Sequence, residues 1–166
     1  MWIMIRKLLL FFILSVLITF EAFSQCAAVA TDACTTNAPT VTGNSIFCNP
    51  PLNNAGRNNF RVTNMIANAT YRLSNCGAGV DTQMTIRNIG GAVVGYNDDG
   101  GPACTGTAAS IDFIPPATGD YRIQVNEFNC ATTPSFNETG DITVTLLSAP
   151  PPSLTNDAPC NAIPLT

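Results

Sequence analysis

The stretch Gly119-Asp-Tyr-Arg-Ile-Gln-Val125 places apolar side chains at every second position, with polar residues between them. Because successive side chains of a strand point to opposite faces, this alternation is typical of a strand with one buried face. Five other short runs, separated by Gly, Asn and Pro, alternate in the same way. Their apolar positions are Phe60 and Val62, Tyr71 and Leu73, Met84 and Ile86, Ile111 and Phe113, and Ile142, Val144 and Leu146. The pattern predicts an all-β, antiparallel, jelly-roll-like β-sandwich of at least six strands, with no helix longer than about two turns in the mature chain.

The amino-terminal segment predicts export. Two basic residues precede the apolar run from Leu8 to Phe20, which as a helix rises about 20 Å, less than the hydrocarbon core of about 30 Å. The small residues of Ala22-Phe-Ser24 then precede Gln25. We therefore expect residues 1–24 to form a helical secretory signal peptide that is cleaved before Gln25. A lipoprotein signal acylated at Cys26 is the alternative.

The composition excludes several classes of function. The 166 residues contain no His, and the one Lys, Lys7, lies in the expected signal peptide. Triads that need His, His-ligated zinc sites, Schiff-base lysines and P-loop lysines therefore lack their central side chain. After removal of residues 1–24, ten acidic residues face five Arg, so the net charge is about −5, which disfavours nucleic acid as a partner. We expect no catalysis, no cofactor and, after signal cleavage, no membrane contact.

All seven Cys lie in the mature chain, and none forms a Cys-x-x-Cys pair. Together with export, this indicates a secreted or cell-surface protein stabilised by disulfides. The spacing predicts three bridges: Cys76–Cys104 across one hairpin, Cys34–Cys48 around a short polar segment, and Cys26–Cys130 from the remainder. Two free thiols are the alternative for the last pair.

The carboxyl-terminal part predicts a domain boundary. We expect the sandwich in residues 25–147, and Ser148-Ala-Pro-Pro-Pro begins a stiff linker over residues 148–155. The segment Asn156-Asp-Ala-Pro-Cys160 is similar to Thr31-Asp-Ala-Cys34. Residues 156–166 are therefore expected to begin a second, truncated module, in which Cys160 lacks its partner.

One predicted hairpin gathers carboxylates. Folding the chain about residue 90, where Gly-Gly favours a tight turn, sets Met84 opposite Tyr96 and brings Asp81 near Asp98 and Asp99. Such oxygen ligands suit Ca²⁺. The other interpretation is a solvated polar turn without a metal.

Four arginines fall on the polar phase of different predicted strands: Arg61, Arg72, Arg87 and Arg122. They predict either a face that binds carboxylate or sulfate groups of an acidic glycan, or arginines that are solvated or paired with Asp and Glu across the sheet.

Five segments between residues 71 and 146 resemble the bacterial pre-peptidase C-terminal domain of large secreted proteins. They are Tyr71-Arg-Leu-Ser-Asn-Cys76, Asp81-Thr-Gln-Met-Thr-Ile86, Tyr96-Asn-Asp-Asp-Gly-Gly101 with Cys104, Gly119-Asp-Tyr-Arg-Ile-Gln-Val125 and Gly140-Asp-Ile-Thr-Val-Thr-Leu146. The resemblance implies a β-sandwich that acts as a non-catalytic accessory module in adhesion, glycan contact or spacing. Its partners would be an extracellular glycan or cell-surface polymer and further domains of the same polypeptide. The alternative is the amino-terminal part of a secreted hydrolase, a peptidase or glycosidase, whose catalytic domain follows Thr166.

Overall fold

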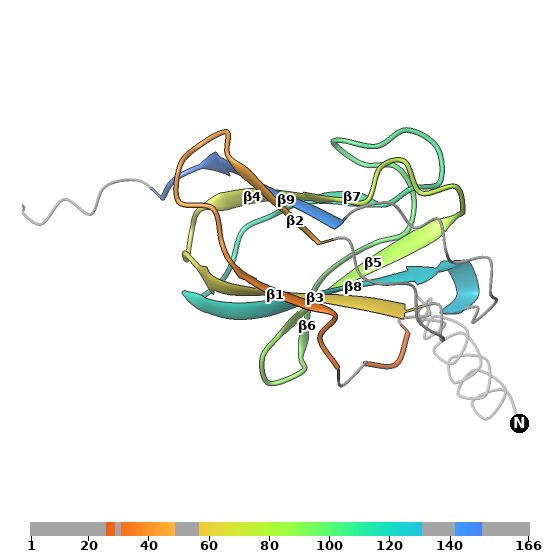
Figure 1. Ribbon diagram of the computed structural model, residues 1–166, viewed down its shortest axis with the longest axis horizontal. Coiled ribbons are helices and arrows are strands. Elements are labelled where there is room, and N and C mark those ends of the chain that lie inside the picture. The colour runs from red at the N-terminus through yellow and green to blue at the C-terminus, as the bar shows by residue number, and fades with distance from the viewer. Residues whose placement is uncertain (1–25, 29–30, 49–56, 131–141, 151–166) are drawn as a thin grey trace, which may run out of the picture.

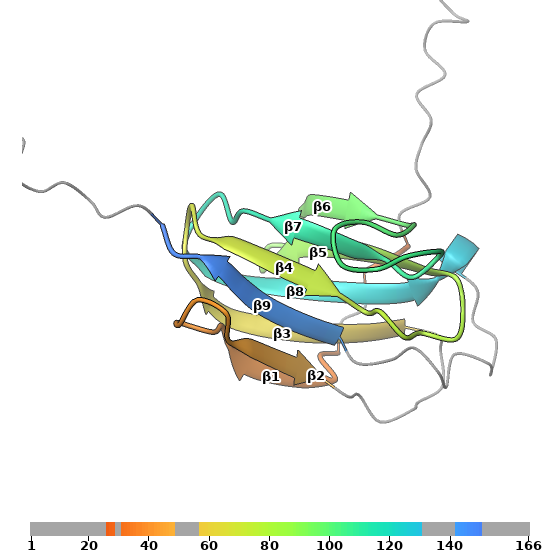
Figure 2. The ribbon, with the colours of Figure 1, turned by 90° about the horizontal axis from the view of Figure 1, so that it is seen from above.

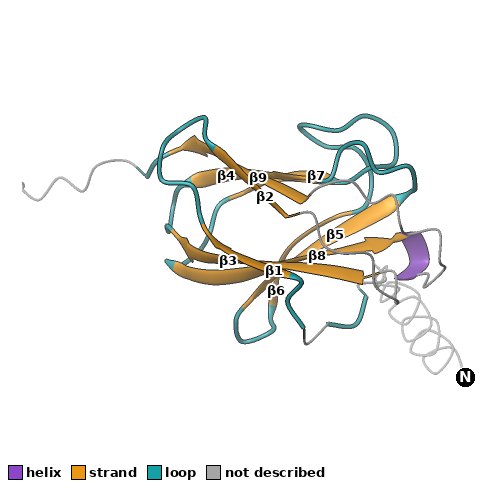
Figure 3. Ribbon diagram, viewed as in Figure 1, coloured by secondary structure: helices purple, strands orange, loops and turns teal. Residues whose placement is uncertain are grey.

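The structure is a computed structural model that describes residues 26–28, 31–48, 57–130 and 142–150 (Figure 1). These residues form nine strands and one short 3-10 helix, which together confirm the all-β class (Figure 3). The elements are β1 (Cys34–Asn37), β2 (Ser45–Cys48), β3 (Arg57–Met65), β4 (Thr70–Ser74), β5 (Thr82–Asn88), β6 (Val93–Asn97), β7 (Ser110–Phe113), β8 (Gly119–Glu127), η1 (Phe128–Cys130) and β9 (Ile142–Ser148). The six strands expected from the alternation are β3, β4, β5, β7, β8 and β9.

The strands form two sheets that pack face to face (Figures 1 and 2). Sheet A has the order β1-β3-β8-β5-β6, and sheet B has the order β2-β9-β4-β7. Without β1, the other eight strands divide into two sheets of four, with the connectivity of a jelly roll. The jelly-roll prediction therefore agrees with the strand order.

The predicted apolar phases form the core between the sheets. Sheet A contributes Phe60, Val62, Met84, Ile86, Ile123 and Val125, and sheet B contributes Tyr71, Leu73, Phe113, Ile142, Val144 and Leu146. Phe113 and Tyr121 meet edge to face across this layer, with ring centroids 5.3 Å apart. Burial of each large apolar side chain contributes about 1.5–3 kcal/mol, so the core accounts for the pairing of the sheets.

One strand pair differs from the expected antiparallel sandwich. β1 runs parallel to β3, with Cys34 opposite Phe60 and Asn37 opposite Thr63. Between these two strands the chain crosses to sheet B, forms β2 there and returns to sheet A. Because the chain reverses its direction twice between β1 and β3, these two strands run parallel.

Three disulfides in the described residues have the predicted pairing. Cys34–Cys48 joins β1 at the edge of sheet A to β2 at the edge of sheet B, with Cα atoms 6.0 Å apart. Cys76–Cys104 joins the segments that follow β4 and β6. Cys26–Cys130 joins the start of the described chain to η1. In the structure both of its sulfurs are bonded to each other, so they are not two free thiols.

The chain enters and leaves the sandwich at opposite ends. Cys26 is bonded to Cys130, just beyond the end of β8, whereas β9 ends at the other end of the long axis and leads to Pro150 (Figures 1 and 2). The expected signal peptide, the residues of the linker beyond Pro150 and the second module lie outside the described residues. Among the described residues, no helix is long and apolar enough to span a membrane.

Candidate functional site

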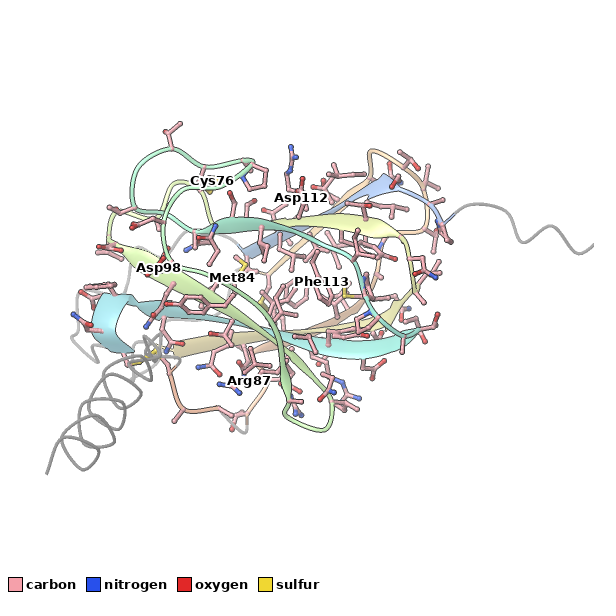
Figure 4. The ribbon with its side chains drawn as sticks, turned by 180° about the vertical axis from the view of Figure 1, so that it is seen from behind. Cys76, Met84, Arg87, Asp98, Asp112 and Phe113 are labelled. Carbon is pink, nitrogen blue, oxygen red and sulfur yellow. A yellow bond between two sulfur atoms is a disulfide. The ribbon has the colours of Figure 1, made fainter. Side chains whose placement is uncertain are left out.

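The outer face of sheet A carries a row of three arginines. Cross-strand pairing sets Arg61 of β3 opposite Arg122 of β8, and Arg122 opposite Arg87 of β5. Adjacent strands lie about 4.8 Å apart, so three positive charges occupy neighbouring positions on one face. Arg72 lies on sheet B, where it pairs with Asp112. Figure 4 shows Arg87 and Asp112 on opposite sides of the sandwich, with Met84 and Phe113 between them.

Two arginines of the row are neutralised by carboxylates. Arg61 Nη2 lies 2.7 Å from Asp120 Oδ2, and Arg122 Nε lies 2.7 Å from Asp32 Oδ1. The hydrogen bond from Arg61, with another from the Asn64 backbone N–H, lowers the pKa of Asp120 below its ordinary value of 3.8. These pairs offset the repulsion that like charges on adjacent strands produce.

Arg87 is the third arginine of the row, and its known contacts are to neutral groups. Its Nη2 donates to the Cys26 carbonyl oxygen at 2.8 Å, and its Nη1 donates to the Gly91 carbonyl oxygen at 3.3 Å. Its Nε is buried without a hydrogen-bond partner, and no carboxylate of the described residues forms an ion pair with it. Within the described residues, the row therefore carries one unbalanced positive charge.

A segment made of residues 26–28 and 31–33, here called the strap, covers this face. Side chains of three adjacent strands donate to its backbone carbonyl groups in order: Arg87 of β5 to Cys26, Gln124 of β8 to Ala27, and Asn59 of β3 to Thr31. Gln83 Nε2 also contacts Cys26 Sγ at 2.7 Å. The polar side chains beneath the strap are almost fully buried: Asn59, Gln83, Thr85, Gln124 and Asn126. Of these, Asn59 and Gln124 donate to strap carbonyl groups, which have no neighbouring strand to satisfy them.

Sequence reasoning did not predict the strap, because polar residues on the outer phase of a strand ordinarily face water. A signal was nevertheless present. Towards one end of β5 and β8 the outer phase carries Gln83, Thr85, Gln124 and Asn126, whereas an exposed strand face commonly carries Lys and Glu. Side chains of this kind form hydrogen bonds without introducing charge, so they are suited to burial.

The predicted hairpin is formed by β5 and β6, but its register differs by one residue. Met84 pairs with Asn97, and Thr85 pairs with Tyr96, whereas Met84 was expected opposite Tyr96. An irregularity between Ile86 and Arg87 admits one additional residue on β6. A bulge of this kind depends on packing against the rest of the sheet, so the residue order of the hairpin did not reveal it.

The three predicted calcium ligands interact electrostatically at the open end of this hairpin. Burial and the charges of Asp99, Asp98 and Glu127 raise the pKa of Asp81 above 3.8. Asp81 Oδ1 is buried without a hydrogen-bond partner. In the described part of the chain, however, no three His, Cys, Asp or Glu side chains are close enough together to hold a metal. A calcium ion would require these carboxylates to approach one another, and the site stays a prediction.

The fold and the three disulfides define an extracytoplasmic β-sandwich module, because such bridges form and persist outside the reducing cytoplasm. The chain matches no family model and no curated protein. Several solved structures match this fold, and two of them are as follows. One is the pre-peptidase C-terminal domain of a collagenase from Bacillus anthracis, which is 11% identical over 72% of this chain and 97% of that chain, with a TM-score of 0.41.

The second similar structure is PliG, a periplasmic inhibitor of g-type lysozyme from Aeromonas hydrophila. It is 15% identical over 70% of this chain and 99% of that chain, with a TM-score of 0.40. Both similarities concern the fold.

Proposed function

We propose that this chain is an extracellular, non-catalytic accessory module of a larger secreted bacterial protein, in which it acts in adhesion and spacing. One observation supports this function above the others. The chain enters the sandwich at Cys26, beside η1, and leaves it after β9, at the opposite end of the long axis. Domain termini are often close together, and a module of that kind adds little length to a polypeptide. When the chain enters a module at one end and leaves it at the opposite end, the module adds its full length to the protein.

The test compares the parent protein with a variant that lacks residues 25–150. The longest strands have nine residues, which corresponds to about 30 Å. We expect the deletion to shorten the largest dimension in solution X-ray scattering by about 30 Å or more, and to weaken attachment to the cell surface. The turnover of any enzymatic domain on a small soluble substrate is expected to stay unchanged. Loss of that turnover, with no change in length, would contradict the proposal.

The alternative is that the module belongs to a secreted hydrolase whose catalytic domain follows Thr166. The reading frame downstream separates the two functions. Further Cys-bearing modules of the same kind favour adhesion and spacing. A domain with a metal-binding or a Ser-His-Asp arrangement favours the hydrolase, and the module would then position that enzyme.

Contact with an acidic glycan is a second candidate function, and the arginine row supports it. Arg87 is half-buried, and no carboxylate of the described residues forms an ion pair with it. Carboxylate and sulfate groups accept paired hydrogen bonds from a guanidinium group.

Calorimetric titration of the mature protein with heparin and with polygalacturonate tests this candidate. We expect R87Q to weaken binding roughly ten-fold or more, since a hydrogen bond to a charged group contributes about 1.5–3 kcal/mol. The control is R72Q, which removes an arginine of sheet B that is already paired with Asp112. Equal binding by the wild type, R87Q and R72Q, or no binding at low salt, would exclude the arginine row as a glycan site.

A further inference from the structure

We propose that the Cys26–Cys130 disulfide makes this module a tension-bearing link, in which a pulling force bypasses most of the chain. The proposal rests on the proposed function in spacing, since a spacer between a cell surface and a partner is pulled at both ends. Four observations support it: the position of the bridge, the place of β9 in sheet B, the Cys34–Cys48 bridge and the burial around Cys26.

The covalent path through the module is short. A force applied at the amino terminus reaches Cys26 and passes through the disulfide to Cys130, 104 residues further along the chain. The residues between these two cysteines include β1 to β8, and they lie outside the path. From Cys130 to Pro150 the path contains about 20 residues, and β9 is its one strand among the described residues.

β9 is held along its length by both neighbours. It forms four residue pairs with β2 and five with β4, and its side chains Ile142, Val144 and Leu146 are at most 1% exposed. The segment η1, which ends at Cys130, lies at one end of the sandwich, and β9 leaves at the other end, so tension draws β9 along its own axis. Antiparallel hydrogen bonds are perpendicular to the strands. Sliding β9 out therefore loads all of these bonds together, rather than one after another.

The Cys34–Cys48 bridge prevents β2 from leaving with β9. β2 is an edge strand of four residues and pairs with β9 alone within sheet B. The bridge attaches β2 covalently to β1 of sheet A. β9 must therefore slide between two fixed neighbours.

The surroundings of Cys26 protect the bridge that carries the force. The Cys26 side chain is 1% exposed, and Gln83 Nε2 lies 2.7 Å from its sulfur. Exchange with an external thiol requires direct attack on a sulfur atom, so burial of Cys26 slows attack on its sulfur, while Cys130 is half-buried. The strap is also held by hydrogen bonds from Arg87, Gln124 and Asn59.

Single-molecule pulling between the two ends of the mature protein tests the bypass. We expect unfolding of the oxidised wild type to release at most the 36 residues after Cys130, which corresponds to about 130 Å of chain. In C26S/C130S the other two bridges still enclose 14 and 28 of the 104 residues, so about 62 residues more, roughly 220 Å, become extensible. Full reduction is expected to release all 104, roughly 370 Å more than the oxidised protein.

The matched control is C76S/C104S. This bridge lies inside the bypassed region, so its removal is expected to leave the released length of the oxidised protein unchanged. If C26S/C130S fails to fold, the oxidised wild type still decides, because a release well above 130 Å overturns the bypass. The role of β9 predicts a high unfolding force. If the oxidised protein unfolds at the low force of a strand whose hydrogen bonds break one after another, that role is overturned. These outcomes concern one module, whereas the scattering test concerns the parent protein, so the two proposals fail independently.

Discussion

Asp81 and Asp120 show opposite effects of environment on an aspartate. Burial first, and then the charges of Asp99, Asp98 and Glu127, raise the pKa of Asp81. Hydrogen bonds from Arg61 and from the Asn64 backbone lower the pKa of Asp120. A raised pKa in the folded state means that ionisation of Asp81 opposes folding, whereas ionisation of Asp120 favours it.

We expect Asp81→Asn and Asp120→Asn to change stability in opposite directions. The folded state favours the protonated form of Asp81, so its contribution to stability is present at low pH and lost as pH rises through its raised pKa. Asp81→Asn should therefore melt at a higher temperature than the wild type at pH 7. The contribution of Asp120 is present above 3.8 and lost as pH falls through its lowered pKa, so Asp120→Asn should melt at a lower temperature at pH 7. Both differences should shrink towards pH 3. Thermal melts at pH 7 and pH 3 check this, and shifts of the same sign would contradict it.

Gly101 lies where a side chain would collide with the backbone of Ser110. A Cβ there would collide with the backbone oxygen and the hydroxyl of Ser110 and with the Asn97 amide, and its φ of +106° disfavours other residues. We expect Gly101→Ala to destabilise the protein by about 1–3 kcal/mol, as overpacking does. Gly106→Ala is the control, because Gly106 also has a positive φ, +78°, but its Cβ would meet open space. Denaturant unfolding compares the two variants. Equal losses of stability would show that the positive φ, and not the collision of the Cβ, causes the destabilisation.

The β5–β6 hairpin combines a constrained turn with an acidic end. At the turn, Gly91 has a φ of +89°, and the Asn88 side chain accepts a hydrogen bond from the Ala92 N–H at 2.9 Å. At the open end, Asp81 is repelled by Asp98 and Asp99. A bound cation would relieve this repulsion.

We expect millimolar Ca²⁺ to bind at Asp81, Asp98 and Asp99, at the weak end of the range for extracellular calcium sites. Calorimetric titration of the mature protein should show heat for the wild type and little for Asp98→Asn. Asp112→Asn, which changes an aspartate on sheet B, is the control and should bind normally. Absence of heat at millimolar Ca²⁺ would leave this end of the hairpin as a solvated turn.

In the whole molecule, the bridges close loops of different length around one core. Cys34–Cys48 spans 14 residues, and Cys26–Cys130 spans 104. Restricting the unfolded chain contributes about 3 kcal/mol for a loop of about 15 residues and about 4.7 kcal/mol for one of about 100. We therefore expect C26S/C130S to lose more free energy of unfolding than C34S/C48S. Urea titrations check the order, and the reverse order would mean that contacts at β1 and β2 outweigh loop length.

The sequence by itself determined the class of fold, and it predicted the disulfide pairs without excluding two free thiols. Period-two alternation is a local property, so six strands and their core side chains, such as Phe60 and Ile123, followed from residue order alone. The three cysteine pairs were predicted as well, but six cysteines admit fifteen pairings, and two free thiols stayed the alternative for Cys26 and Cys130 until the structure showed all three bridges. β1 and β2 were not, since each has four residues and β1 is largely exposed, which removes the alternation that marks a buried strand.

Only the tertiary structure decided which side chains share a face. Arg61, Arg87 and Arg122 are 26 or more positions apart in the sequence, and strand order alone sets them side by side while it leaves Arg72 on the other sheet. The strap lies across side chains whose polarity suggested exposure, and the bulge in the β5–β6 hairpin moved a register by one residue. Each of these features depends on contacts between distant segments. Local alternation says which side of a strand is apolar, but it carries no information about which strands become neighbours.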